Sequence, residues 1–129
     1  MGTPGASKDD LRALNHEVYA ALTADPPITS ALITAALRSP PAAEALRAFW
    51  ADRYARSAAV VRRAVARGEI RADVDAYRLL VAATAPLYHE LVLLGTTPTP
   101  RLADQAARDA AAAARAGAFT VDTSVAMGS

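Results

Sequence analysis

The sequence contains no cysteine, which excludes a disulfide framework, a thiolate metal site and a cysteine nucleophile. It also lacks an excess of charge of one sign, because 14 basic and 13 acidic residues leave a formal net charge of +1. Such a balance gives no electrostatic footprint for nucleic acid or for an anionic membrane surface. A composition with 53% hydrophobic and 21% charged residues is, however, too hydrophobic for a disordered chain.

A hydrophobic run long enough to cross a membrane is missing as well. The most hydrophobic run, Leu79–Leu94, is too short for a span and contains Pro86, His89 and Glu90. The first residues, Met1–Ser7, are small and polar, and no apolar stretch follows a basic start, as a secretory signal would require. We therefore expect a cytoplasmic protein with no membrane partner.

The residue groupings of common catalytic sites are absent too. The sequence has no Ser/His/Asp constellation, no glycine-rich phosphate loop and no pair of carboxylates on an apolar helix face. His16 and His89 lie far apart, without acidic or cysteine partners at the spacing of metal ligands. We expect neither an enzyme nor a bound metal or other cofactor.

Alanine is the most abundant residue, at 34 of 129 positions. Patterns typical of α-helices recur five times along the sequence. The first expected helix begins near the Ser7–Asp10 capping box and ends before Asp25-Pro26-Pro27. Leu11, Leu14, Val18 and Leu22 form its apolar face, with Asn15 close to that face and His16 toward solvent. The other four expected helices span approximately residues 28–38, 41–67, 76–94 and 100–116.

Local signals mark the ends of these helices. Asp75 and Thr99 are suited to precede helices, since a short polar side chain can accept from the first free backbone N–H groups. Gly68, Gly95 and Gly117 are suited to follow helices, where left-handed backbone geometry is needed. The pattern predicts one helical domain over residues 8–117, with disordered tails at 1–7 and 118–129.

The fourth and fifth expected helices carry more apolar and small surface than a monomer covers readily. From Leu79 to Tyr88 nearly every residue is apolar or small, and a helix that is apolar all round is buried on more than one side. Pairing with a second copy across a two-fold axis explains this pattern, and a central helix in a monomeric bundle is the alternative. The expected dimer-interface residues are Leu79, Ala83, Leu94, Leu102, Ala106, Ala110 and Ala113.

Polar side chains interrupt an aromatic stretch on the third expected helix. Trp50 and Tyr54 have the spacing of ordinary core residues, whereas Arg53 and Ser57 stand on the same turns. An apolar pocket with a few convergent polar groups is typical of a small-molecule site. Pro86 is expected to kink the fourth helix and to shape a pocket between the first, third and fourth helices. The expected ligand-binding residues are Asn15, Tyr19, Trp50, Arg53, Tyr54, Ser57, Thr84 and Tyr88.

The turn after the third expected helix carries a recognisable motif. It reads Arg67-Gly68-Glu69-Ile70-Arg71-Ala72-Asp73-Val74-Asp75, and Ala85-Pro86-Leu87-Tyr88 follows on the next helix. Together with Phe49-Trp50, this order resembles the C-terminal effector domain of TetR-family transcriptional regulators over about residues 8–117. Two positions depart from the family pattern, since Ala85 replaces a glycine and His89-Glu90 replaces a Tyr-Arg pair.

The resemblance implies an all-α, five-helix antiparallel bundle that dimerises through its last two helices. It also implies a ligand-sensing domain of a transcriptional repressor, with a small and largely apolar molecule as effector. TetR-family proteins place a helix-turn-helix head before this domain, so we expect DNA as a partner only through such a head, which this sequence lacks. The competing hypothesis is a helical protein–protein interaction module without a small-molecule site; a cavity in the protomer would favour the first hypothesis.

Overall fold

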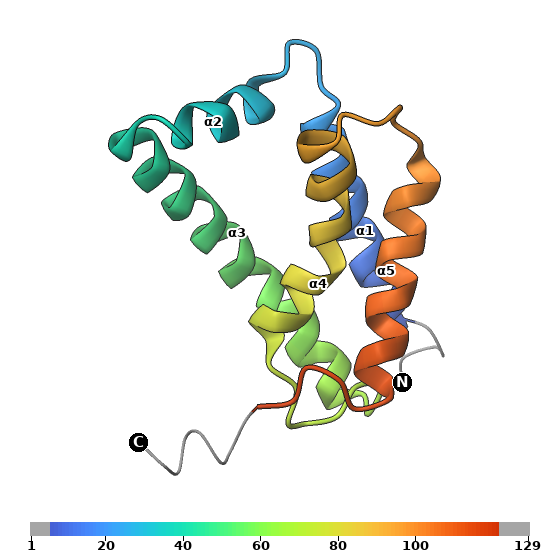
Figure 1. The fold of residues 1–129 in the computed structure, drawn as a ribbon. Helices are drawn as coiled ribbons and strands as arrows, with labels where there is room; N and C mark the ends of the chain where they lie inside the picture. Colours follow the sequence, from blue (N-terminus) through green and yellow to red (C-terminus); the bar gives the residue numbers. More distant parts are fainter. Residues whose placement is uncertain (1–5, 122–129) are drawn as a thin grey trace.

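The computed structural model describes residues 6–121, with side chains described from Asp9 onward, and shows a bundle of helices (Figure 1). Within this range the chain forms five α-helices and no strand. They are α1 (Ala6–Leu22), α2 (Ile28–Ala36), α3 (Pro40–Ala66), α4 (Ala76–Tyr88) and α5 (Pro100–Arg115), and a π-helix, η1 (His89–Leu93), continues α4. The all-α, five-helix prediction is therefore confirmed.

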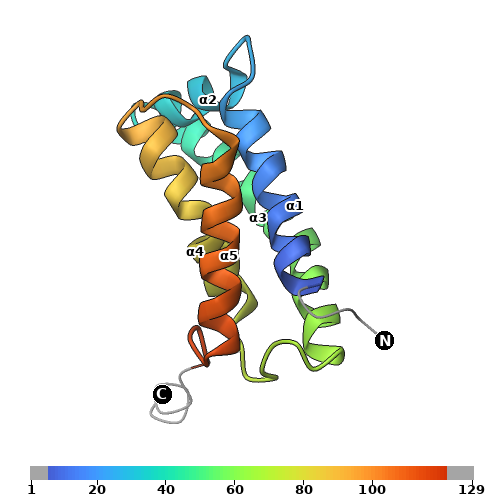
Figure 2. The ribbon, with the colours of Figure 1, turned by 90° about the vertical axis from the view of Figure 1, so that its right-hand side faces the viewer.

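Three of the helices form the packed centre of the molecule. α1, α4 and α5 lie side by side, and α5 runs antiparallel to the other two (Figures 1 and 2). α3 joins them through its C-terminal half and leans away from α4 toward its N-terminal end, where α2 packs on it (Figure 1). No helix in the described part of the chain combines the length and the apolar character needed to cross a bilayer.

Large aliphatic side chains from α1 and α4 fill the core. Leu11, Leu14, Val18 and Leu22 of α1 are all buried, which confirms the predicted apolar face. They meet the fully buried face of α4, which consists of Leu79, Leu80, Ala83, Thr84 and Leu87. α2, in contrast, has no buried residue at all.

The alanine face of α5 packs inside this core. Ala103, Ala106, Ala107, Ala110, Ala111 and Ala114 are buried, and α5 contacts both α1 and α4. Alanine buries little area, but it lets two helices approach closely. The face that the sequence suggested for contact with a second copy is therefore used within one protomer.

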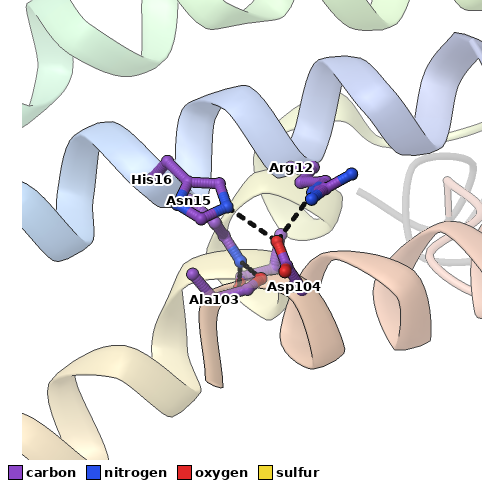
Figure 3. A network of polar contacts seen from close by, with 6 residues as sticks. Arg12, Asn15, His16, Ala103 and Asp104 are labelled. Carbon is purple, nitrogen blue, oxygen red and sulfur yellow. Dashed lines mark hydrogen bonds and ion pairs between the residues drawn. The ribbon is translucent and has the colours of Figure 1, made fainter. Parts of the chain in front are cut away.

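Polar contacts fasten α1 to α5 at the level of Asn15 (Figure 3). The Asn15 Nδ2 donates to the carbonyl oxygens of Ala83, at 2.8 Å, and Ala103, at 3.1 Å, so this buried amide links three helices. Beside these contacts and closer to the surface, the Asp104 Oδ1 lies 2.7 Å from both the His16 Nε2 and the Arg12 Nε. Hydrogen bonds from His16 and then Arg12 hold the pKa of the Asp104 carboxyl below its usual value.

Several of the predicted end signals are found in the structure, and Gly68 and Asp75 belong to the motif after α3. Gly68, Gly95 and Gly117 all have positive φ angles, and Asp75 caps α4 by accepting from the backbone N–H of Arg78. Thr99 precedes α5 as predicted, but its side chain makes no cap hydrogen bond.

The ordered chain continues beyond Gly117, which corrects the boundary expected from the sequence. Phe119 packs against the core, its carbonyl accepts from the Asp75 N–H, and the Val121 N–H donates to the Asp73 carbonyl. These contacts fix residues 118–121 to the start of α4. The predicted tails otherwise fall on residues 1–5 and 122–129, which lie outside the described range, while α1 already includes Ala6 and Ser7.

Pro86 was expected to kink the fourth helix. In the structure, the helix changes from α to π shortly after Pro86. Proline has no N–H to donate to the carbonyl one turn earlier, so the hydrogen-bond ladder is interrupted at this point. Three residues later the chain enters η1, where the Leu94 N–H donates to the His89 carbonyl five residues back. The α-helix expected to reach Leu94 therefore ends at Tyr88.

The close packing of α5 makes a prediction about stability. Ala107→Leu should lower the free energy of unfolding by about 1–3 kcal/mol, because added methylenes overpack a closed core. Ala112→Leu, on the exposed side of the same helix, should change it by less than ~0.5 kcal/mol. Urea denaturation followed by circular dichroism measures both values, and equal effects of the two substitutions would contradict the packing described here.

The Asp104 cluster makes a prediction about pH. Because the pKa of this carboxyl is lowered in the folded state, its contribution to stability is present above the ordinary aspartate range and is lost as the pH falls through the folded pKa. Asp104→Asn should therefore destabilise the protein at neutral pH, and its difference from the wild type should shrink as the pH falls below the ordinary aspartate pKa of about 4. Asp52→Asn, which removes an exposed i,i+4 pair with Arg56, is the control. A difference for Asp104→Asn that stays constant with pH would refute the interpretation.

Candidate functional site

A cleft with an aromatic lining opens between α3 and α4, where α3 leans away. Its volume is about 520 Å³, and we call it the aromatic cleft. Its lining residues come from α2, α3 and α4, and are Ile33, Leu46, Arg47, Trp50, Ala51, Tyr54, Tyr77 and Tyr88. No acidic residue is among those that line it in the described chain.

Trp50 is the centre of the aromatic cleft. Its ring centroid lies 5.5 Å from that of Tyr88 in an edge-to-face arrangement and 5.7 Å from that of Tyr54 in a tilted one. Tyr54 in turn meets Tyr77 edge to face at 5.5 Å. Phe49 touches the Trp50 ring from outside the cleft, at 5.3 Å. Four aromatic rings from two helices therefore form a continuous surface for an apolar molecule.

Helical spacing explains how the rings come together. Leu46, Trp50 and Tyr54 stand four residues apart and share one face of α3. Tyr77 and Tyr88 are separated by three turns of α4 and so project from the same side of that helix. Each helix thus contributes one aromatic wall.

A second cleft, of about 420 Å³, lies between α1 and α3 on the other side of Arg53. We call it the α1–α3 cleft, and its lining residues are Asp10, Leu11, Ala13, Leu14, Glu17, Arg53, Arg56, Ser57, Val60 and Leu80. Arg53 connects the two clefts, because its guanidinium carbon lies 5.3 Å from the centroid of the Trp50 ring.

The polar groups next to the aromatic cleft differ in how well they are satisfied. The Tyr54 hydroxyl lies 3.4 Å from the Thr84 Oγ1, which also donates to the Leu80 carbonyl. The Tyr88 hydroxyl and the Arg53 Nε are buried and have no hydrogen-bond partner among the described residues. Burial raises the pKa of Tyr88, the neighbouring Tyr54 adds to this effect, and the Arg53 charge opposes it.

The structure brings some of the expected ligand-binding residues together and separates others. Trp50, Tyr54 and Tyr88 line the aromatic cleft, whereas Arg53 and Ser57 line the α1–α3 cleft. Thr84 lies behind Tyr54, where it is buried.

Two expected ligand-binding residues on α1 line neither cleft. Asn15 is buried as expected, but its amide is engaged by the carbonyls of α4 and α5. Tyr19 packs against the core. α1 turns this side toward α4 and α5, so these residues do not face the opening beside α3.

Several expected interface residues are also corrected. Leu79 and Ala83 have no exposed surface, and Ala106 and Ala110 are buried against neighbouring helices of the same protomer. Leu102 and Ala113 are only partly buried, and Leu94 is exposed. Only these last three remain available to a second copy.

Sequence reasoning missed Tyr77 and Arg47 as lining residues. The eleven-residue separation of Tyr77 from Tyr88 was a usable signal, because it places both rings on one side of a helix. Arg47 stands one turn before Trp50 on α3, which was a second signal. Among the described residues, no three His, Cys, Asp or Glu side chains form a group that could hold a metal ion.

Comparison with known families gives a match over most of the chain. The model described as the tetracyclin repressor-like C-terminal domain matches residues 4–110, which is most of the chain. No curated protein matches the chain.

Proposed function

The chain belongs to the family of tetracyclin repressor-like C-terminal domains, and we propose that it is the ligand-sensing and dimerisation domain of a TetR-like transcriptional repressor. In this proposal a small, largely apolar molecule binds in the aromatic cleft. The domain performs no chemistry on that molecule, and its effect on DNA passes through a helix-turn-helix domain.

The aromatic cleft is the observation that carries the proposal. A volume of about 520 Å³ lies within the range of small-molecule sites, and a mostly apolar lining with a few polar groups is typical of them. Aromatic rings provide a large contact area with little loss of conformational entropy on binding. A helical interaction module without a small-molecule site has no need of such a cleft.

The proposed dimer forms through the outer sides of α4, η1 and α5. Ala85, His89 and Leu93 are exposed there, and Leu102 and Ala113 are partly exposed. Leu93 alone leaves 73% of its surface uncovered. A contact between two copies would remove this apolar surface from water, which favours association.

DNA contact is assigned to a separate domain for an electrostatic reason. Affinity for DNA requires several Lys or Arg side chains to neutralise phosphates. The chain has a net charge of +1, and five of its arginines pair with carboxylates among the described residues, as in the Arg71–Asp73 and Arg67–Glu69 contacts.

Ligand binding is tested through Trp50, the single tryptophan of the chain. Biphenyl-4-methanol, a neutral aromatic probe, should change the Trp50 fluorescence saturably. Tyr77→Leu should weaken its binding about threefold to tenfold, because one aromatic wall loses its ring. Tyr19→Leu, the same substitution at a tyrosine outside both clefts, should leave the dissociation constant within about twofold. No saturable response, or equal effects of both substitutions, would refute binding in the aromatic cleft.

Dimerisation is tested by sedimentation equilibrium. The wild-type domain should be dimeric at micromolar concentration, and Ala85→Glu should raise the dimer dissociation constant at least about tenfold, because two carboxylates would be desolvated in the contact. Ala85 is exposed in the protomer, so the fold should persist. Ala20→Glu on the exposed side of α1 is the matched control. A monomeric wild type, or a dimer indifferent to Ala85→Glu, would contradict the proposed interface.

A further inference from the structure

The Arg53 side chain is largely covered and has few hydrogen-bond acceptors. Only 18% of it is exposed, yet its one ion pair is a 3.4 Å contact from a terminal nitrogen to Glu17, whose own side chain is 70% exposed. The Nε atom has no partner among the described residues. A guanidinium has five N–H groups, and burial without acceptors is costly. The arrangement of the folded chain therefore leaves Arg53 short of an anionic partner.

The Tyr88 hydroxyl is a second donor with the same deficit. It is buried and unpaired among the described residues. Because its pKa is raised, the hydroxyl keeps its proton at neutral pH and can donate. Arg53 lies close enough to act on this pKa, and both side chains contact the Trp50 ring. Two donor groups without acceptors among the described residues, the Arg53 Nε and the Tyr88 hydroxyl, therefore belong to side chains that contact one aromatic ring.

The charge among the residues that line the aromatic cleft has one sign. Arg47 is the only charged residue that lines it, and Arg47 makes no ion pair among the described residues. The two arginines stand on either side of Trp50 on α3, three residues before it and three after it. Four aromatic rings could also hold an organic cation through cation–π contacts. Two neighbouring arginines and the lack of a carboxylate in the lining oppose a cation and favour an anion.

From these contacts we infer that the ligand of the aromatic cleft is an organic anion with a flat apolar body. The body lies on Trp50 and Tyr54 in the aromatic cleft. A carboxylate at the edge of this cleft accepts hydrogen bonds from the Tyr88 hydroxyl and from Arg53, which lines the neighbouring α1–α3 cleft and lies over the Trp50 ring. The carboxylate takes the place of Glu17 at the guanidinium, and the Glu17 side chain moves into solvent. This inference rests on the proposed role of the aromatic cleft and specifies the chemical class of its ligand.

Three probes with the same body and different charge test the inference. Biphenyl-4-carboxylate, biphenyl-4-methanol and biphenyl-4-methylammonium are titrated into the wild-type domain at neutral pH, with isothermal calorimetry as the readout. The carboxylate should bind at least about tenfold more tightly than the alcohol, since hydrogen bonds to charged groups are the stronger kind. The ammonium should bind more weakly than the alcohol.

Variants then locate the source of the preference. Arg53→Gln should abolish the preference for the carboxylate and leave the affinity for the alcohol within about threefold. Tyr88→Phe should reduce the preference in part. Glu17→Gln should bind the carboxylate at least as tightly as the wild type, because the competing charge is gone. Arg63→Gln removes the same charge from an exposed position on the same helix and should leave the preference unchanged.

The outcomes separate this inference from the proposed function. If the alcohol binds and the carboxylate binds no more tightly, the anion inference is overturned and the role of the aromatic cleft stands. If Arg53→Gln and Arg63→Gln reduce the preference equally, a diffuse field rather than Arg53 is responsible, and the inference is likewise overturned. If none of the three probes binds, both the inference and the proposed function fail.

Discussion

The close approach of α5 to α1 and α4 is the constraint on which the rest of the structure depends. Alanine permits this approach but contributes little buried area, so the leucines and valines of α1 and α4 provide the bulk of the core. Asn15 joins the three helices by hydrogen bonds that apolar contact alone does not supply. α3 adds Val61 and Ala64 to this core, both from its C-terminal half. Its N-terminal and central turns carry Leu46, Trp50 and Tyr54 away from α5, and the aromatic cleft is the result.

Local features of the chain were readable from the sequence because their causes are local. A positive φ at Gly68, a cap at Asp75 and a proline at the start of α5 each depend on a few neighbouring residues. The sequence does not show which helix covers a buried face. Periodicity shows that Leu79 and Ala110 must be covered, but an alanine surface packs equally well against a helix of the same chain or of a second copy. The path of the chain through residues 94–99 settles the question, since it folds α5 back onto α4 (Figure 1).

The candidate site, too, could be predicted only in part from the sequence. The four-residue spacing of Trp50 and Tyr54 brought them onto one wall of the aromatic cleft, and Tyr88 joined them from α4. Arg53 and Ser57 stand on the same turns of α3, yet they face the α1–α3 cleft, because one residue along a helix changes direction by about 100°. Asn15 was correctly expected to be buried. Its partners are backbone carbonyls of distant residues, and no sequence pattern identifies those.

α4 has one side in the aromatic cleft and an adjacent side on the outer surface. Tyr77 and Tyr88 line the cleft, whereas Ala85 and His89 are exposed on the neighbouring side of the helix, away from the core. A ligand against the two tyrosines thus contacts the same helix that the proposed dimer uses. Contact with α4 does not by itself change the dimer, because a ligand shifts the equilibrium between two conformations only by its difference in affinity for them. The segment from Pro86 through η1 is where two such states are least costly to reach. There the proline lacks an N–H, so one α-helical hydrogen bond is missing, and the following hydrogen bonds join residues five apart. A change in the direction of α4 at this point therefore disrupts fewer regular hydrogen bonds.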